Sequence, residues 1–218
     1  MAAGEKGWER DEDGRTAVHR LAAAGDEAGV RQGLARCGEE SGVEDAQDEG
    51  GWAALHSSAA AGHLGCVRAL LEAGALVDMR NGSQATALML AASKGRGECV
   101  EALLSGGADP LLRDRVGATA LHRAAAQGRL PEVRALLGAR QGRRAVKVTD
   151  VEESTPAHLA AAEGHLEVLK ALFEAASGVE GGLEACRGAR NREEKTPQEV
   201  ALDSRTADFI QRFAGEDW

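Results

Sequence analysis

Apolar residues along this chain follow a pattern that returns at a nearly constant interval. Each copy opens with an alanine-rich block of ten residues that ends in glycine. A valine or leucine lies five residues after that glycine, and an apolar pair follows three and four residues later, as in Val67, Leu70 and Leu71. This i, i+3, i+4 spacing is typical of one face of an α-helix. The pattern therefore predicts two short helices per copy, joined by a glycine-containing turn.

Five copies of the alanine-rich block align without gaps. They are residues 16–25 (TAVHRLAAAG), 53–62 (AALHSSAAAG), 86–95 (TALMLAASKG), 119–128 (TALHRAAAQG) and 155–164 (TPAHLAAAEG). A degenerate sixth copy, TPQEVA, begins at Thr196. The histidine position falls at residues 19, 56, 89 (a methionine), 122 and 158, so the spacings are 37, 33, 33 and 36 residues. A period of about 33 residues with T-P-L-H-x-A is the ankyrin signature, and the chain resembles the ankyrin-repeat family.

That resemblance implies an all-α fold, an ankyrin-repeat solenoid of about six helix–turn–helix repeats with β-turn fingers. Threonine before the first helix caps its free N–H groups, and Pro156 and Pro197 suit the first helical position. Longer loops are expected where the spacing between repeats is longer than the period, at residues 38–49, 141–147 and 177–190. We place an acidic tail at residues 1–12 and the repeats at 13–48, 49–81, 82–114, 115–150, 151–191 and 192–218, the last being a degenerate cap.

Composition agrees with thin, closely packed helices, because 43% of residues are hydrophobic but only 3% are aromatic. The four cysteines form no C-x-x-C pair, and neither a signal peptide nor a long apolar run is present. We therefore expect free thiols in the cytoplasm and nucleus, and no membrane association.

Net charge is −9, which argues against a general nucleic-acid binder, but the charge is uneven. Residues 1–50 hold 13 acids and 6 bases, whereas residues 111–148 hold 2 acids and 9 bases. Such asymmetry favours electrostatic steering toward a protein partner. Arg113 and Arg115 lie in the basic segment and are candidate partner contacts.

Four histidines share one repeat position: His19, His56, His122 and His158. As zinc ligands they would have to lie about 2 Å from one ion, whereas packed helices are about 8–10 Å apart. We expect them to be structural, bonding turn backbone to helix, and we expect His63 and His165 to be exposed. No phosphate-binding glycine loop, nucleophile motif or metal-ligand cluster is found. The chain is not expected to be an enzyme or to bind a cofactor or metal.

The binding candidates follow from the stacked architecture, in which turns project as fingers and first helices line a concave surface. The finger candidates lie just before each threonine-like position: Arg15, Trp52, Gln84, Val116 and Glu153. On the first helices the candidates are Arg20, Ser57, Leu90, Arg123 and Leu159, followed on the same face by Ala24, Ala61, Lys94, Gln127 and Glu163. Tryptophan and arginine are enriched in binding hot spots, which favours Trp52 and Arg123. For Trp52, packing across the hairpin remains an equal alternative.

Three stretches also resemble the gankyrin family, the proteasome non-ATPase regulatory subunit ten family. They are residues 48–56 (DEGGWAALH), 118–130 (ATALHRAAAQGRL) and 191–201 (NREEKTPQEVA). The resemblance covers residues 11–213 approximately. It implies a chaperone for assembly of the proteasome regulatory particle, which clasps the C-terminal domain of one ATPase subunit.

Two departures from that family limit what is carried over. The family has a further N-terminal repeat, so the N-terminal cap here is missing, degenerate or replaced by packing around Trp8. The L-x-C-x-E segment of animal members, associated with retinoblastoma-protein binding, has Ala161 in place of cysteine, and that activity is not expected. An ankyrin adaptor for another protein, such as a kinase or transcription factor, is the alternative. A monomer is expected, because polar end caps remove the need for self-association.

Overall fold

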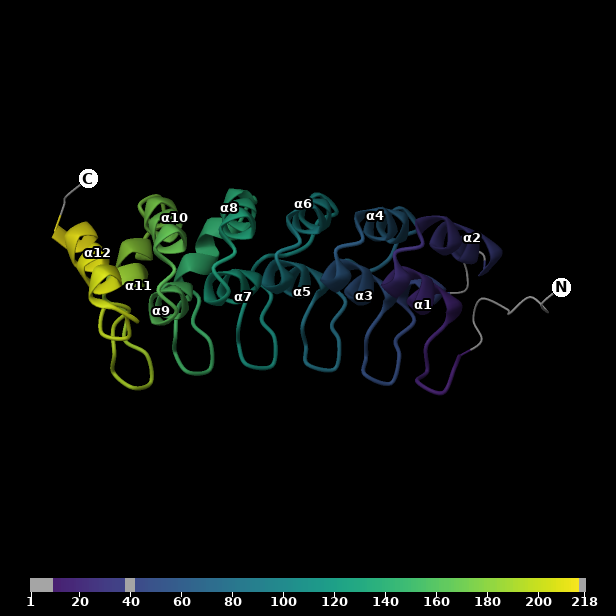
Figure 1. Cartoon of the computed structure of the whole chain (residues 1–218), viewed down its shortest axis with the longest axis horizontal. Helices are drawn as coiled ribbons and strands as arrows, with labels where there is room; N and C mark the ends of the chain where they lie inside the picture. Colours follow the sequence, from purple (N-terminus) through teal and green to yellow (C-terminus); the bar gives the residue numbers. More distant parts are fainter. Residues whose placement is uncertain (1–9, 38–41, 216–218) are drawn as a thin grey trace. The chain divides into compact units, whose positions relative to one another are not determined.

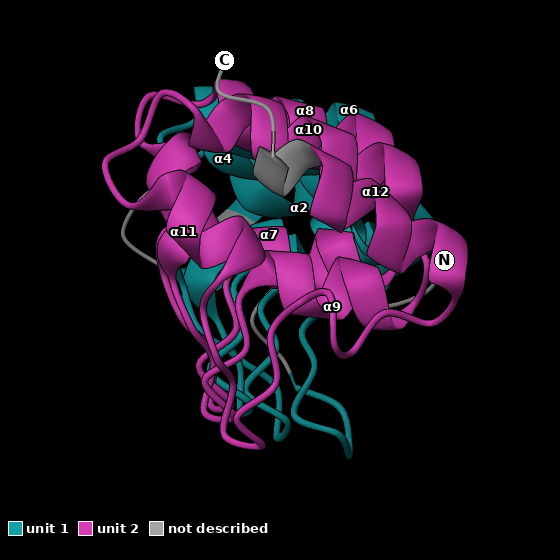
Figure 2. Cartoon of the chain, turned by 90° about the vertical axis from the view of Figure 1, so that its left-hand side faces the viewer, with its two compact units in different colours: residues 1–108 teal, residues 109–218 magenta. Residues whose placement is uncertain are grey.

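The computed structural model describes residues 10–37 and 42–215, and every regular element among them is helical (Figure 1). The chain divides into two compact units, Met1–Ala108 and Asp109–Trp218 (Figure 2). Both units are built from pairs of short antiparallel helices joined by tight turns. The predicted all-α repeat fold is confirmed.

Unit 1 contains three helix pairs. They are α1 (Ala17–Ala24) with α2 (Glu27–Cys37), α3 (Ala54–Ala61) with α4 (Leu64–Glu72), and α5 (Ala87–Lys94) with α6 (Gly97–Ser105). Within the unit, first helices contact first helices and second helices contact second helices. The fingers project from the row of first helices (Figure 1).

Unit 2 contains two regular pairs and a modified end. The pairs are α7 (Ala120–Ala126) with α8 (Leu130–Gly138), and α9 (Pro156–Ala162) with α10 (Leu166–Ala176). After them come α11 (Gly182–Arg187) and α12 (Ser204–Gly215). In the sixth repeat the first helix is reduced to a turn at residues 197–200, which fits its degenerate sequence.

The core of each unit is made of small and branched aliphatic side chains. Alanines of the first helices, such as Ala59 and Ala124, have no exposed surface, so neighbouring helices approach closely. The second helices contribute large side chains, among them Leu70, Leu136 and Leu172, each at most 1% exposed. Burying one such side chain stabilises the fold by roughly 1.5–3 kcal/mol. Neither helix row could bury this surface alone, so stability comes from stacking.

The turn between the two helices of a repeat depends on glycine. Gly25 has φ 77° and packs so closely under the imidazole of His63 that a Cβ atom there would lie 2.7 Å from Nδ1. His63 Nε2 also lies 3.2 Å from the carbonyl oxygen of Ala23. His165 covers Gly128 in the same way. The prediction that these two histidines are exposed is wrong: both are half-buried, since each closes the turn of the preceding repeat.

The three segments predicted as longer loops all contain short helices. They are the 3₁₀ helices η1 (Val43–Asp45) and η2 (Gly142–Lys147), and α11 in the glycine-rich stretch. Each is anchored by buried apolar side chains, such as Val43, Val146 and Cys186. Burial against neighbouring helices, rather than local propensity, orders these segments.

At the N-terminus, Asp11 falls in the predicted tail but contributes hydrogen bonds to the first finger. The suggested packing around Trp8 lies outside the described residues.

Candidate functional site

Each finger is closed by an aspartate or asparagine five residues before the threonine-like position. Oδ1 of Asp48 accepts the backbone N–H of Gly50 at 2.9 Å and that of Trp52 at 2.8 Å. The same pair of bonds is made by Asp11, Asn81, Asp114, Asp150 and Asn191. Such side-chain acceptors take the place of backbone acceptors in a turn. This position was not among the predicted sites, although Asp or Asn stands at the same offset in all six copies.

One residue in each finger adopts the left-handed conformation, two positions before the threonine-like residue. Three fingers have glycine there, as at Gly51, whereas Gln84 (φ 62°), Glu153 (φ 59°) and Glu194 (φ 60°) occupy the others. Gln84 and Glu153, both predicted partner contacts, are therefore exposed residues at a fixed and unusual point of the backbone.

The four repeat histidines link each first helix to the following finger. Nδ1 of His122 accepts the N–H of Thr119 at 3.2 Å, so the ring proton lies on Nε2, which donates to the Ser154 carbonyl at 3.1 Å. His19, His56 and His158 make the same two kinds of bond. The prediction that these histidines are structural is confirmed.

Burial lowers the pKa of all four histidines, and that of His122 falls to about 4. The hydrogen bonds also require a neutral ring, because Nδ1 must accept an N–H and only the neutral ring has an acceptor nitrogen. The rings are thus held neutral as parts of the scaffold.

Arg113 braces two neighbouring fingers of unit 2. Its Nε donates to the Gly117 carbonyl at 2.9 Å, and its Nη2 donates to the Thr149 carbonyl at 2.6 Å. In unit 1, the Gln47 side chain makes the equivalent bonds to the carbonyls of Gly51 and Arg80, at 2.6 and 2.8 Å. Arg113 was predicted to contact a partner, and its role in bracing the fingers was not predicted.

Arg123 has a similar structural task. Its Nε donates to Oδ2 of Asp114 at 2.9 Å, and Nη2 contacts the same oxygen. The Asp114 side chain is 2% exposed, whereas that of Arg123 is 43% exposed. The guanidinium therefore compensates a buried carboxylate that also closes the fourth finger, although part of Arg123 remains open to solvent.

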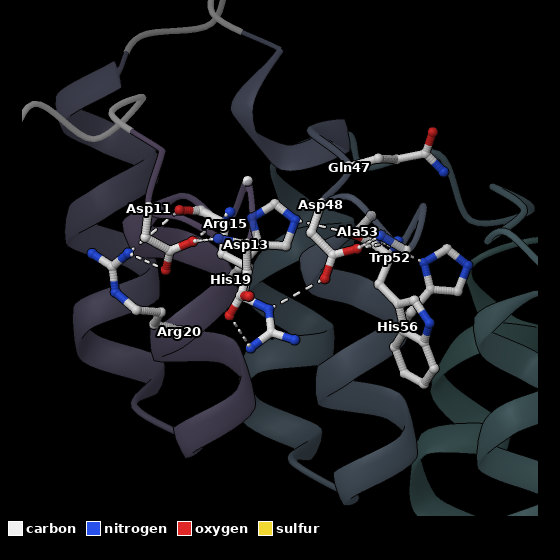
Figure 3. A network of polar contacts seen from close by, with 12 residues as sticks. Asp11, Asp13, Arg15, His19, Arg20, Gln47, Asp48, Trp52, Ala53 and His56 are labelled. Carbon is white, nitrogen blue, oxygen red and sulfur yellow. Dashed lines mark hydrogen bonds and ion pairs between the residues drawn. The ribbon is translucent and has the colours of Figure 1, made fainter.

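Unit 1 has an open groove of about 890 Å³ between the first two fingers and helices α1 and α3. Of the residues predicted to contact a partner, it brings together Arg15, Arg20, Trp52 and Ser57. Ala24 and Ala61 also line it. Figure 3 shows both arginines among the finger carboxylates and Trp52 beside His56.

Charges in this groove are paired in part. Arg15 Nε lies 3.3 Å from Asp48 Oδ2, and Arg20 Nη1 lies 3.0 Å from Asp11 Oδ2 (Figure 3). Burial acts to raise the pKa of Asp48, but hydrogen bonds from the Trp52 N–H and from Arg15 outweigh it, so this pKa lies below its ordinary value. The groove thus presents fixed charges of both signs.

Trp52 packs within its repeat and also lines the groove. Its ring centroid lies 6.1 Å from that of His56, at an interplanar angle of 59°. The side chain is half-buried and also lines the groove. Packing within the repeat therefore leaves part of the ring available to a partner.

The remaining candidates lie outside this groove. In unit 1, Gln84 and Lys94 are exposed on the third repeat. In unit 2, Leu159 is half-buried, and the following are exposed: Arg115, Val116, Gln127, Glu153 and Glu163. Gln127 and Glu163 occupy equivalent positions at the C-terminal ends of α7 and α9.

The described residues include no group of three or more His, Cys, Asp or Glu side chains that could hold a metal ion. Cys66, Cys99 and Cys186 are buried free thiols whose pKa values are raised, mainly by burial. In the same part of the chain, no helix has the length and apolar character needed to cross a membrane.

Comparison with protein families matches two models of ankyrin repeats. A model of three ankyrin-repeat copies matches residues 88–185, and a second ankyrin-repeat model matches residues 55–104. Together they cover residues 55–185, which is more than half of the chain. A search of curated proteins gives no match.

Proposed function

We propose that this chain, which belongs to the ankyrin-repeat family, is a chaperone for assembly of the proteasome regulatory particle. Ankyrin repeats are protein-interaction modules, typically without enzymatic activity. The proposed client is the C-terminal domain of one ATPase subunit of the particle. The chain would hold this domain, prevent its premature docking on the proteolytic core, and then leave.

The observation that supports a binding role concerns one position of each first helix, directly after the structural histidine or methionine. This position varies, whereas its neighbours do not. Neighbouring positions are nearly constant and buried, because they form the scaffold. The position itself keeps some contact with solvent, since Arg20 is exposed and the other four residues are half-buried, and it varies in chemistry: Arg20, Ser57, Leu90, Arg123 and Leu159. A constant framework with variable exposed positions is what a recognition surface requires.

The proposal of a proteasomal client rests on the three stretches that resemble gankyrin, residues 48–56, 118–130 and 191–201. Two of these overlap the groove and the helix that carries Arg123. The mixed charges of the groove also suit a reversible grip, because charge complementarity sets specificity and association rate more than affinity. We propose that the protein acts as a monomer in the cytoplasm and nucleus.

An ankyrin adaptor for a kinase or a transcription factor is the second candidate. The variable positions on the first helices support it equally, since a fold does not fix its partner. The two candidates differ in the protein that co-purifies.

The test is a pull-down from native extract with tagged protein, beside two double variants of equal net charge. The first, Lys94→Glu/Glu163→Arg, reverses exposed charges at the ends of the first helices α5 and α9. The matched control, Arg68→Glu/Glu101→Arg, reverses exposed charges on the second helices α4 and α6. Arg123 is left intact because it supports the buried Asp114.

The expected result is recovery of one regulatory-particle ATPase without the proteolytic core. This recovery should fall with salt and with the first double variant, but not with the control. Recovery of another protein with the same dependence would favour the adaptor. If no ATPase is recovered at low salt, the chaperone proposal is refuted.

A further inference from the structure

A cluster of exposed basic residues in unit 2 lies in η2 and directly before it. Two arginines of the basic segment, Arg113 and Arg123, are bonded within the scaffold as described above. By contrast, Arg140, Arg143, Arg144 and Lys147 are all exposed and fall within eight residues. No acidic residue lies between Glu132 and Asp150.

These charged residues lie on a segment that is anchored to the rest of unit 2. Ala145 and Val146 of η2 are buried, at 1% and 0% exposure, and η2 contacts α8, α9, α10 and α11. Among the described residues, no ion pair involves Arg140, Arg143 or Arg144. Lys147 donates only a 3.4 Å hydrogen bond to the carbonyl of Glu180. Side-chain charges on a preordered segment lose less entropy on binding than those on a flexible tail.

A small groove of about 250 Å³ adjoins η2 between the second helices α8 and α10. Arg134 and Arg143 line it together with Leu137 and Ala171, and Glu174 is the one acidic residue in the lining. The groove belongs to the second helices, whereas the proposed client surface belongs to the first helices and fingers. It is a separate surface.

We propose that the η2 basic surface, formed by Arg134, Arg140, Arg143, Arg144 and Lys147, binds a short acidic segment of a protein. Arg144 and Lys147 are three residues apart in a 3₁₀ helix, so they share one face with an axial separation of about 6 Å. Alternate side chains of an extended strand are about 7 Å apart. An extended segment with acids at alternate positions therefore matches this spacing.

The surroundings favour a short peptide over a nucleic acid. Glu174 and Glu180 are exposed on the adjoining segment, and Asp150 follows η2. Repulsion from these carboxylates acts on more charges of a long polyanion than of a short segment, so it disfavours a nucleic acid more strongly. The groove lining has no aromatic side chain on which a base could stack, and stacking is the usual contact for single strands.

The proposal is tested with purified full-length protein by fluorescence anisotropy, using a labelled ten-residue peptide of alternating Glu and Ala. The same peptide with Gln for Glu is the uncharged control. Arg143→Glu/Arg144→Glu removes the central charges of the surface. Arg68→Glu/Arg212→Glu makes the same change of net charge at exposed positions elsewhere. Circular dichroism establishes that each variant is folded, and Arg140→Gln/Arg144→Gln serves if the first one is not.

The acidic peptide is expected to bind wild type and the control double variant alike, and to bind Arg143→Glu/Arg144→Glu at least about tenfold more weakly. Binding should weaken in about 300 mM salt relative to 50 mM. Absence of binding to wild type, or equal loss in the control variant, would overturn the proposal. So would tighter binding of a labelled single-stranded oligonucleotide that is lost in the same variant. None of these outcomes depends on the proteasomal client.

Discussion

Replacing His122 by methionine tests whether the repeat histidines stabilise the fold only in their neutral form. The third repeat already has methionine at this position, Met89, where it is 2% exposed, so the side chain suits the site. At about pH 7.5 the variant loses the bonds of His122 to the Thr119 N–H and the Ser154 carbonyl. At about 1 kcal/mol per bond, we expect a loss of about 2 kcal/mol in the free energy of unfolding.

The difference between the two proteins should then shrink as the pH falls. The pKa of His122 is about 4 in the folded chain, against an ordinary value of 6.5. The unfolded chain therefore binds the proton more tightly, so the stabilisation is complete above pH 6.5 and is lost toward pH 4. Between about pH 7.5 and pH 4.5 this linkage lowers the stability of wild type by roughly 2 to 3 kcal/mol. His122→Met has no such loss, so the two proteins should be about equally stable near pH 4.5.

Urea unfolding followed by circular dichroism at several pH values and constant ionic strength measures this difference. Carboxylates and the histidines at positions 19, 56 and 158 titrate in both proteins, so their effects cancel in the comparison. A gap that stays constant within about 0.5 kcal/mol from pH 7.5 to pH 4.5, or that widens, would refute the reasoning.

Three further predictions concern the fingers, and urea unfolding at neutral pH measures each of them. Gln84→Gly should stabilise unit 1 by up to about 1 kcal/mol, because glycine relieves the left-handed strain at φ 62°; a loss of stability would contradict this. Asp114→Asn should cost about 1 kcal/mol and Asp114→Ala about 3, because the asparagine Oδ1 still accepts the two backbone N–H groups, as that of Asn81 does. Equal costs would show that those two hydrogen bonds contribute little. Arg113→Ala should lower the stability by about 1 kcal/mol, because it removes the bonds that brace two fingers. Arg140→Ala, a control at an exposed position, should lower it by less than about 0.5 kcal/mol. Similar effects would argue against the bracing role of Arg113.

Much of the fold was predictable because the information is local and repeated. Helix positions follow from the spacing of apolar residues inside one repeat, and alanine blocks with few aromatic residues indicate closely packed helices. The structural role of His122 could be predicted for the same reason, since its partner, the N–H of Thr119, lies three residues away, as it does in each copy that has the histidine. The Asp or Asn that closes each finger could also have been found from its constant offset.

The candidate site was less predictable, because its chemistry depends on partners in other repeats. Arg113 reaches the carbonyl of Thr149 in the next finger, and Arg15 reaches Asp48, so their charges are partly used within the chain. A count of bases along the sequence does not reveal such pairing. Arg15, Arg20, Trp52 and Ser57 share one groove only because two repeats stack side by side.

The sequence by itself determined the number, type and order of the repeats, since each repeat's helices are specified by residues within it. Tertiary structure decided where the exposed charge lies and how the insertions fold. Residues 141–147, predicted as a loop, contain η2 because Ala145 and Val146 are buried where η2 packs against helices distant in sequence. That burial holds Arg143, Arg144 and Lys147 outward. A short basic loop without such anchoring would have no fixed surface, and only the packed neighbours provide it.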